Sequence, residues 1–242
     1  MYSNNIKRIL LLTVFIALMT VGARAQVKSY FGFFGGVSNA LSDFKSTDYN
    51  NNKAGFGKRG LTYGLDGAYY FYKNLGIGAS ITYQDNGELN QTDANNLAAG
   101  YTNSFGADNS AVTGVNRYQS VNILLGPQYS FSYGKFILDV RAAAGIVKVY
   151  SSPETTIYVG GVTNQTTDFY QKSASATVLG YSGTAALRYK LSDNVFLTLR
   201  GAYLYSSGPS VTNQGRTTDI GRIVTKLPIT TINTTLGLTF GL

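Results

Sequence analysis

Five ionisable residues lie on the small, polar face of alternating segments: Asp66, Asp139, Arg141, Arg188 and Arg200. The other face of each segment is apolar, because residue types alternate with the period of two that a β-strand imposes. Opposite charges that are withdrawn from water together form ion pairs, and carboxylates can also transfer protons. The sequence predicts that these five residues meet inside a closed sheet and form a buried, structural ion-pair network.

The residue types that are missing restrict the chemistry further. The sequence contains no His and no Cys, which excludes imidazole acid–base catalysis and thiolate metal ligands. We find no Ser–Lys pair and no carboxylate pair in a pattern typical of catalysis. The prediction is a non-enzymatic protein with no catalytic residue, no cofactor and no metal site.

The composition favours strands over a solvated surface. Charged residues make up 13% of the chain, whereas a soluble domain typically has about 25%. Gly, Ser, Thr, Asn and Gln supply the polarity, as in strands with one apolar and one small polar face. The net charge is +8, and it falls to +5 without Lys7, Arg8 and Arg24. The remaining Lys and Arg are scattered, so we expect no nucleic-acid partner.

An apolar run near the N-terminus, residues 9–22, follows two basic residues. A helix that spans a bilayer needs about 20 apolar residues, so this run is too short for an anchor. Residues 23–25 have the small-x-small pattern of a signal-peptidase site. The sequence therefore predicts a cleaved signal peptide at residues 1–25 and one exported domain at residues 26–242.

Eight segments alternate as strands do. They are residues 29–37, 60–72, 75–85, 117–133, 135–150, 175–190, 195–205 and 227–242. Short turns alternate with long polar stretches between them. The long stretches are residues 38–59, 86–116, 151–174 and 206–226. Structureless loops of that length are rare in soluble domains but typical of transmembrane barrels, which have short periplasmic turns and long external loops.

Two of the long stretches contain shorter strand-like pieces. Residues 155–159 and 166–170 flank a Gly160-Gly161 turn, and residues 210–212 are predicted to pair with residues 216–218. Protruding hairpins of this kind either offer edges for partner binding by strand addition or are inert solvated loops.

Two kinds of barrel fit the alternation. A lipocalin-like barrel in water has its apolar face inside, and a barrel in lipid has it outside. Three observations favour lipid: the polar face lacks the Lys and Glu of a solvated surface, aromatic residues gather toward the strand ends, and an export signal is predicted. An Arg or Lys that faces lipid at mid-membrane costs about 2 to 4 kcal/mol, so the charged residues mark the lumen.

Three motifs carry a family resemblance: YFGFFGG at residues 30–36, YYFYKNLGIGASITY at residues 69–83, and the closing GLTFGL. With them the chain resembles the OmpA/OmpX-like eight-stranded outer-membrane β-barrel family over residues 29–242. The resemblance implies an all-β fold, an eight-stranded antiparallel transmembrane β-barrel in the outer membrane of a Gram-negative cell. The assembly signal of that family usually ends on an aromatic residue, whereas here Phe240 lies two residues before Leu242.

The resemblance also implies partners: outer-membrane lipid and lipopolysaccharide, the barrel-assembly machinery during insertion, and a protein partner through the external loops. Side chains fill the interior of an eight-stranded barrel, so the network predicts a plugged lumen, and Gly76-Ile77-Gly78 is interpreted as small residues where the lumen is crowded. The leading prediction is a structural or surface-interaction protein. The alternatives are a small passive porin-like channel and, third, a lipid-modifying or proteolytic barrel enzyme, for which the His on which such enzymes rely is missing.

Overall fold

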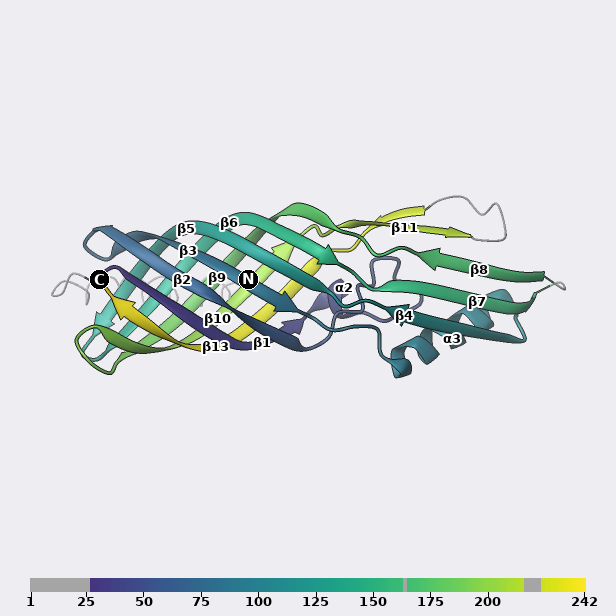
Figure 1. Cartoon of the computed structure of the whole chain (residues 1–242), viewed down its shortest axis with the longest axis horizontal. Coiled ribbons are helices and arrows are strands. Elements are labelled where there is room, and N and C mark those ends of the chain that lie inside the picture. Colours follow the sequence, from purple (N-terminus) through teal and green to yellow (C-terminus); the bar gives the residue numbers. More distant parts are fainter. Residues whose placement is uncertain (1–26, 163–164, 216–222) are drawn as a thin grey trace, which may run out of the picture.

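Eight strands close into an antiparallel barrel (Figure 1). The structure, a computed structural model, describes residues 27–162, 165–215 and 223–242, and the predicted signal peptide lies outside them. In sheet order the strands are β1 (Tyr30–Ala40), β13 (Ile229–Gly241), β10 (Val195–Ser206), β9 (Ala176–Lys190), β6 (Phe136–Ser151), β5 (Gln119–Tyr133), β3 (Leu75–Asp85) and β2 (Gly60–Tyr72). The predicted barrel is confirmed, with every predicted strand within three residues at each end.

The barrel closes where the first strand meets the last. Phe33 of β1 pairs with Leu65 of β2 on one side and with Leu238 of β13 on the other. Because each strand has two neighbours, the barrel has no open edge whose backbone groups lack partners. The short turns and the C-terminus lie at one end, which we call the turn end (Figure 1). The other is the loop end.

The apolar face of the strands points outward. Leu65 is 58% exposed, whereas Thr62 on the opposite face of β2 is 1% exposed. Exposed aromatic residues lie near both ends, among them Tyr63 and Phe71. This arrangement contradicts the lipocalin-like alternative, because leucine side chains on the outside are stable in lipid and not in water. Among the described residues, no helix is long and apolar enough to cross a membrane.

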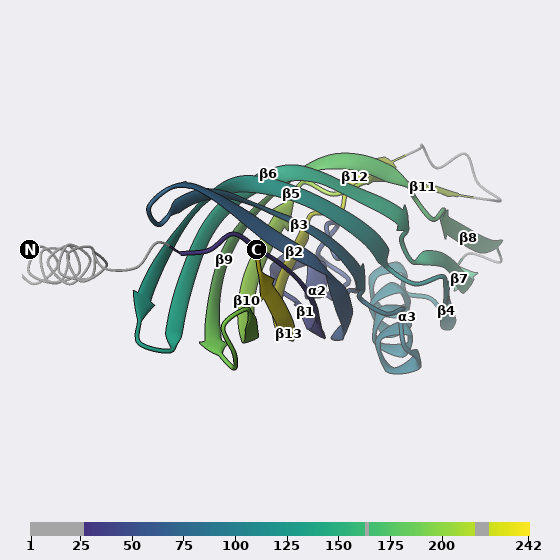
Figure 2. The same cartoon turned by 60° about the vertical axis from the view of Figure 1, so that its left-hand side comes forward.

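A second, open sheet extends from the loop end (Figures 1 and 2). Its order is β12 (Ile223–Lys226), β11 (Ser210–Gly215), β8 (Gln165–Gln171), β7 (Glu154–Val162) and β4 (Asn109–Val115). A helix, α3 (Gln91–Phe105), packs against β4 and β7. We call this sheet, α3, residues 46–59 and residues 86–90 the loop unit. It has a hydrophobic core of its own, formed by Ala54, Phe56, Leu89, Ala94, Leu97, Ala98, Val112, Ile157 and Val159.

The prediction that residues 86–116 form a structureless loop is wrong. The side chain of Asn90 accepts a hydrogen bond from the Asp93 backbone N–H at 2.9 Å and caps α3, and Gly106 ends the helix in the left-handed conformation. Ala94 and Leu97 face the core at helical spacing. The polar composition hid the helix, because packing of this apolar face stabilises it more than intrinsic propensity does.

One of the two predicted hairpins is correct and the other is not. Ile157 of β7 pairs with Phe169 of β8, as expected. Val211 of β11, however, pairs with Thr225, and the predicted partner segment, residues 216–218, lies outside the described residues. β11 also extends beyond the predicted last residue, 212, and Asn213 pairs with Gln171 of β8.

A short helix closes the mouth of the barrel at the loop end. In α2 (Ser42–Lys45), Phe44 is fully buried and its ring lies edge-on to that of Tyr118 at 4.7 Å. The apolar cluster around it includes Val147 and Leu204. A Cβ at Gly55 would lie 2.9 Å from the Phe44 ring, so only glycine leaves room for it. The stretch predicted as a polar loop therefore supplies an apolar cap.

Candidate functional site

The five predicted lumen residues come from four strands and lie together in the turn half of the barrel. Arg141 Nη1 lies 2.8 Å from Asp66 Oδ1, and Arg188 Nε lies 2.7 Å from Asp139 Oδ2. Arg200 Nη2 is farther from Asp66 Oδ1, at 3.7 Å. All five side chains are buried or nearly so. The structure thus brings all five together as two close ion pairs and one loose contact.

Three uncharged residues connect the ion pairs. Gln128 accepts a hydrogen bond from Arg141 Nε at 2.8 Å and donates one to the Tyr70 hydroxyl at 2.5 Å. The Tyr30 hydroxyl donates to Asp66 Oδ2 at 3.0 Å. Sequence reasoning missed these three residues. The available sequence signal was their position on the polar face of the segments that form β1, β2 and β5.

Gly78 leaves the space in which the Arg141 guanidinium lies. A Cβ at this position would overlap that guanidinium. The guanidinium of Arg188 lies over the Tyr30 ring, 4.0 Å from its centroid. The network therefore depends on small and aromatic neighbours as well as on charge. This agrees with the interpretation of Gly76-Ile77-Gly78 as small residues in a crowded lumen.

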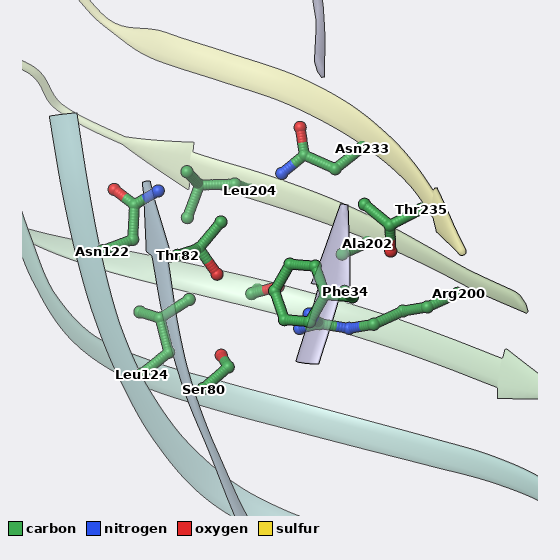
Figure 3. A pocket seen from close by; sticks show the side chains of 11 residues that line it. Phe34, Ser80, Thr82, Asn122, Leu124, Arg200, Ala202, Leu204, Asn233 and Thr235 are labelled. Carbon is green, nitrogen blue, oxygen red and sulfur yellow. The ribbon is translucent and has the colours of Figure 1, made fainter. Parts of the chain in front are cut away.

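A layer of amide side chains follows toward the loop end. Asn122 Nδ2 donates to Gln84 Oε1 at 2.6 Å, and Gln84 Nε2 donates to Asn233 Oδ1 at 2.9 Å. A cavity of about 20 Å³ lies between this layer and Arg200 (Figure 3). That volume holds roughly one water molecule. A cavity of this size is too small for a solute to pass through.

Three buried polar atoms around the cavity have no hydrogen-bond partner in the part of the chain that the structure describes. They are Arg200 Nε, Asn122 Oδ1 and Thr235 Oγ1. A buried water typically serves groups of this kind, because each unpaired atom otherwise loses its hydration without compensation. Three guanidinium groups also face two carboxylates here, so the lumen carries one excess positive charge.

The arrangement of side chains in the lumen suits a structural role rather than catalysis. Both carboxylates accept hydrogen bonds from arginines, which hold them in fixed positions. Within the described ranges, no cluster of three or more His, Cys, Asp or Glu side chains is arranged to hold a metal ion. From turn end to loop end, the interior consists of the ion pairs, the small cavity with its amide layer, and the cap around Phe44.

A second site lies in the loop unit. A pocket of about 290 Å³, which we call the aromatic pocket, opens between α3, the outer sheet and residues 48–56. The Tyr101 ring lies 4.7 Å from that of Tyr49, 6.3 Å from that of Phe105 and 6.1 Å from that of Phe169. Burial, and then the neighbouring Tyr49, raise the pKa of the Tyr101 hydroxyl to about 12. The Tyr101 phenol therefore remains an uncharged donor at neutral pH.

Charges join the first long loop to the second. Lys58 pairs with Asp93 in the first turn of α3. Burial lowers the pKa of the Lys58 ammonium, followed by repulsion from Lys45. Arg117 pairs with Asp85 at 2.9 Å where β3 ends. These pairs are partly exposed, so each contributes little stability by itself.

No protein-family model and no curated protein matches the sequence. Several solved structures have a similar fold. Neisserial surface protein A is 14% identical with a TM-score of 0.45, and the match covers 88% of this chain and 97% of that chain. The attachment invasion locus protein Ail of Yersinia pestis is 14% identical with a TM-score of 0.45, over 89% of this chain and 100% of that one. The outer membrane protein AlkL is 16% identical with a TM-score of 0.39, over 91% and 93%.

The chain is an eight-stranded β-barrel protein. That statement rests on the closed strand order and on the outward apolar face. At the identities and TM-scores above, the similar structures add no argument about activity, ligand or partner.

Proposed function

We propose that this protein is a non-enzymatic surface-interaction protein of a Gram-negative outer membrane. In this proposal the barrel is a closed anchor and the loop unit is the part that meets partners outside the cell. One observation carries the proposal: the loop unit has its own hydrophobic core and its own pocket beyond the barrel. A barrel that served only as a membrane plug would need neither.

The outer membrane is the location that the exterior supports. Large apolar side chains cover the outside, and the five charged residues of the ion-pair network lie in the lumen, as a hydrocarbon environment requires. The predicted signal peptide is part of the same proposal. Insertion would then involve the barrel-assembly machinery, and the rim of the barrel would contact lipid and lipopolysaccharide.

The anchor role is favoured over a passive channel because successive layers block the lumen. The ion pairs occupy the turn half, and Phe44 with its apolar neighbours caps the mouth at the loop end. Recording single-channel currents across planar bilayers tests this choice. We expect no steady conductance from the purified full-length mature chain, and stable unitary steps would contradict the anchor role.

The recognition role needs a second experiment. In a barrel-only variant, the segments that form α3 and β4, and β7 and β8, are replaced by short Gly-Asn turns. Both proteins are placed in phosphatidylcholine nanodiscs and tested for retention on surfaces coated with lipopolysaccharide and on cultured host cells. We expect the full chain to be retained on these surfaces or cells and the barrel-only variant to pass through. Equal retention of both proteins, or of neither, would contradict a recognition role for the loop unit.

A further inference from the structure

We propose that the aromatic pocket binds a neutral saccharide unit. This inference deepens the proposed function, on which it rests, because it names the ligand class of the loop unit. A sugar ring presents C–H groups on its face and hydroxyl groups around its rim. A complementary site therefore needs an aromatic plane, side chains that both donate and accept hydrogen bonds, and no strong charge.

Three aromatic rings from two elements supply the aromatic surface of the pocket. Tyr101 and Phe105 of α3 lie with their rings nearly parallel, at 18°, and Phe169 of β8 stacks against Tyr101 at 26°. Phe105 is 40% exposed. A large aromatic side chain that remains exposed beside a pocket offers a face on which a ligand can stack.

The hydrogen-bonding groups of the pocket are amides. Gln171 of β8 and Asn213 of β11 are directly paired across the sheet, so their side chains share the face that lines the pocket. Asn51 and Asn52 contribute two further amides from the first long loop. Each amide has a donor and an acceptor, as a sugar hydroxyl does.

The charge of the pocket excludes the main competing ligands. Of the described residues that line it, only Asp48 is charged, and it is acidic. Sulfated sugars and phosphates are typically bound by Arg or Lys, so they do not fit. An acyl chain would bury the amides without partners, at a cost for each of them. A volume of about 290 Å³ lies at the lower limit for ligand pockets and suits one or two sugar rings.

The position of Tyr49 indicates that the pocket wall is preformed. Gly100 lies within α3, where glycine is destabilising relative to alanine. A Cβ at this position would lie 2.7 Å from Tyr49 Cβ and Cγ. The glycine therefore lets Tyr49 close against the helix and complete the wall.

The test uses the mature full-length protein in phosphatidylcholine nanodiscs, because detergents with sugar head groups would compete. Methyl glycosides of glucose, galactose, mannose and N-acetylglucosamine are titrated by saturation-transfer NMR and calorimetry. We expect at least one to bind with a dissociation constant of about 1 mM or below. The affinity should be unchanged between about 50 and 500 mM NaCl, because a neutral ligand is not screened.

Two variants and one control locate the binding site. Phe105→Ala removes the exposed stacking face and should weaken binding at least about tenfold. Asn213→Ala should weaken it by a smaller factor. Tyr158→Ala is the matched control, because Tyr158 is also an exposed aromatic residue of the loop unit but does not line the pocket. It should leave the affinity unchanged.

Several outcomes would overturn the inference: no glycoside binds up to about 10 mM, heparin or octanoate binds in place of the glycosides, or Phe105→Ala and Tyr158→Ala weaken binding equally. The proposed function is tested separately, by the retention of the full chain and the barrel-only variant. If the glycosides fail while the full chain alone is retained on lipopolysaccharide or on cells, the saccharide inference is wrong and the recognition role of the loop unit stands.

Discussion

Replacing Arg188 by Met tests directly whether the buried ion pairs stabilise the barrel. Met keeps much of the volume but removes two hydrogen bonds to Asp139, at 2.7 and 3.0 Å, and the cation above the Tyr30 ring. Asp139 then keeps only the hydroxyls of Ser130, at 2.5 Å, and Tyr70, at 3.3 Å. Breaking one partner of a buried pair costs about 3 to 5 kcal/mol. Because two hydroxyls remain, we expect a loss near the lower value, about 3 kcal/mol.

The assay is equilibrium unfolding by urea in phosphatidylcholine vesicles, followed by far-ultraviolet circular dichroism. Arg200→Met is the matched control, since Arg200 is also buried but its nearest carboxylate oxygen is 3.7 Å away, too far for a close ion pair. We expect it to change the free energy of unfolding by less than about 1 kcal/mol. The double variant Arg188→Met, Asp139→Leu removes both members of this pair and so leaves no unpaired carboxylate, and most of the lost stability should return.

Two results would refute this reasoning. If Arg188→Met and Arg200→Met cost the same, close pairing is not what stabilises the lumen. If the double variant is no more stable than Arg188→Met alone, the loss does not come from an unpaired carboxylate.

Three further predictions concern the packing of the lumen, the cap and the pocket. Gly78→Ala should lower the free energy of unfolding by about 1 to 3 kcal/mol in the same assay, because the added methyl displaces the Arg141 guanidinium; an unchanged value would contradict the close fit. Phe44→Ala should cost about 3 to 5 kcal/mol, since it empties the apolar cap, and a loss below about 1 kcal/mol would argue against the cap. Tyr101 should ionise only near pH 12, as read by absorbance at alkaline pH against Tyr101→Phe. Because its pKa is raised when folded, its contribution to stability is complete below about pH 10 and is lost as the pH rises toward 12, so a midpoint near 10 would contradict its burial beside Tyr49.

The lumen residues could be predicted because a strand has only two faces. Once Leu65 is assigned to lipid, Asp66 must point inward, and the same logic holds for Asp139 and Arg141. The pairing within the network could not be predicted in this way. It depends on the register between strands, which brings Arg141 opposite Gln128 on the neighbouring strand and within reach of Asp66 farther around the barrel.

The aromatic pocket had no comparable signal. Tyr49, Tyr101 and Phe169 lie in three different long loops, and nothing in their spacing indicates that they meet. Local signals for α3 were present, namely the Asn90 cap and Gly106, but the polar composition outweighed them. The cap residue Phe44 was hidden for the same reason, because a single aromatic residue in a polar loop carries no periodicity.

The sequence by itself determined the strands, their two faces and the barrel, because alternation with a period of two is a local property that every strand repeats. It also determined which charges enter the lumen. Only the tertiary structure decided which carboxylate meets which arginine, that Phe44 caps the mouth, and that the long loops fold into a unit with a pocket. Those features arise from contacts between residues far apart in the chain, and such contacts follow from strand register and barrel closure rather than from any local pattern.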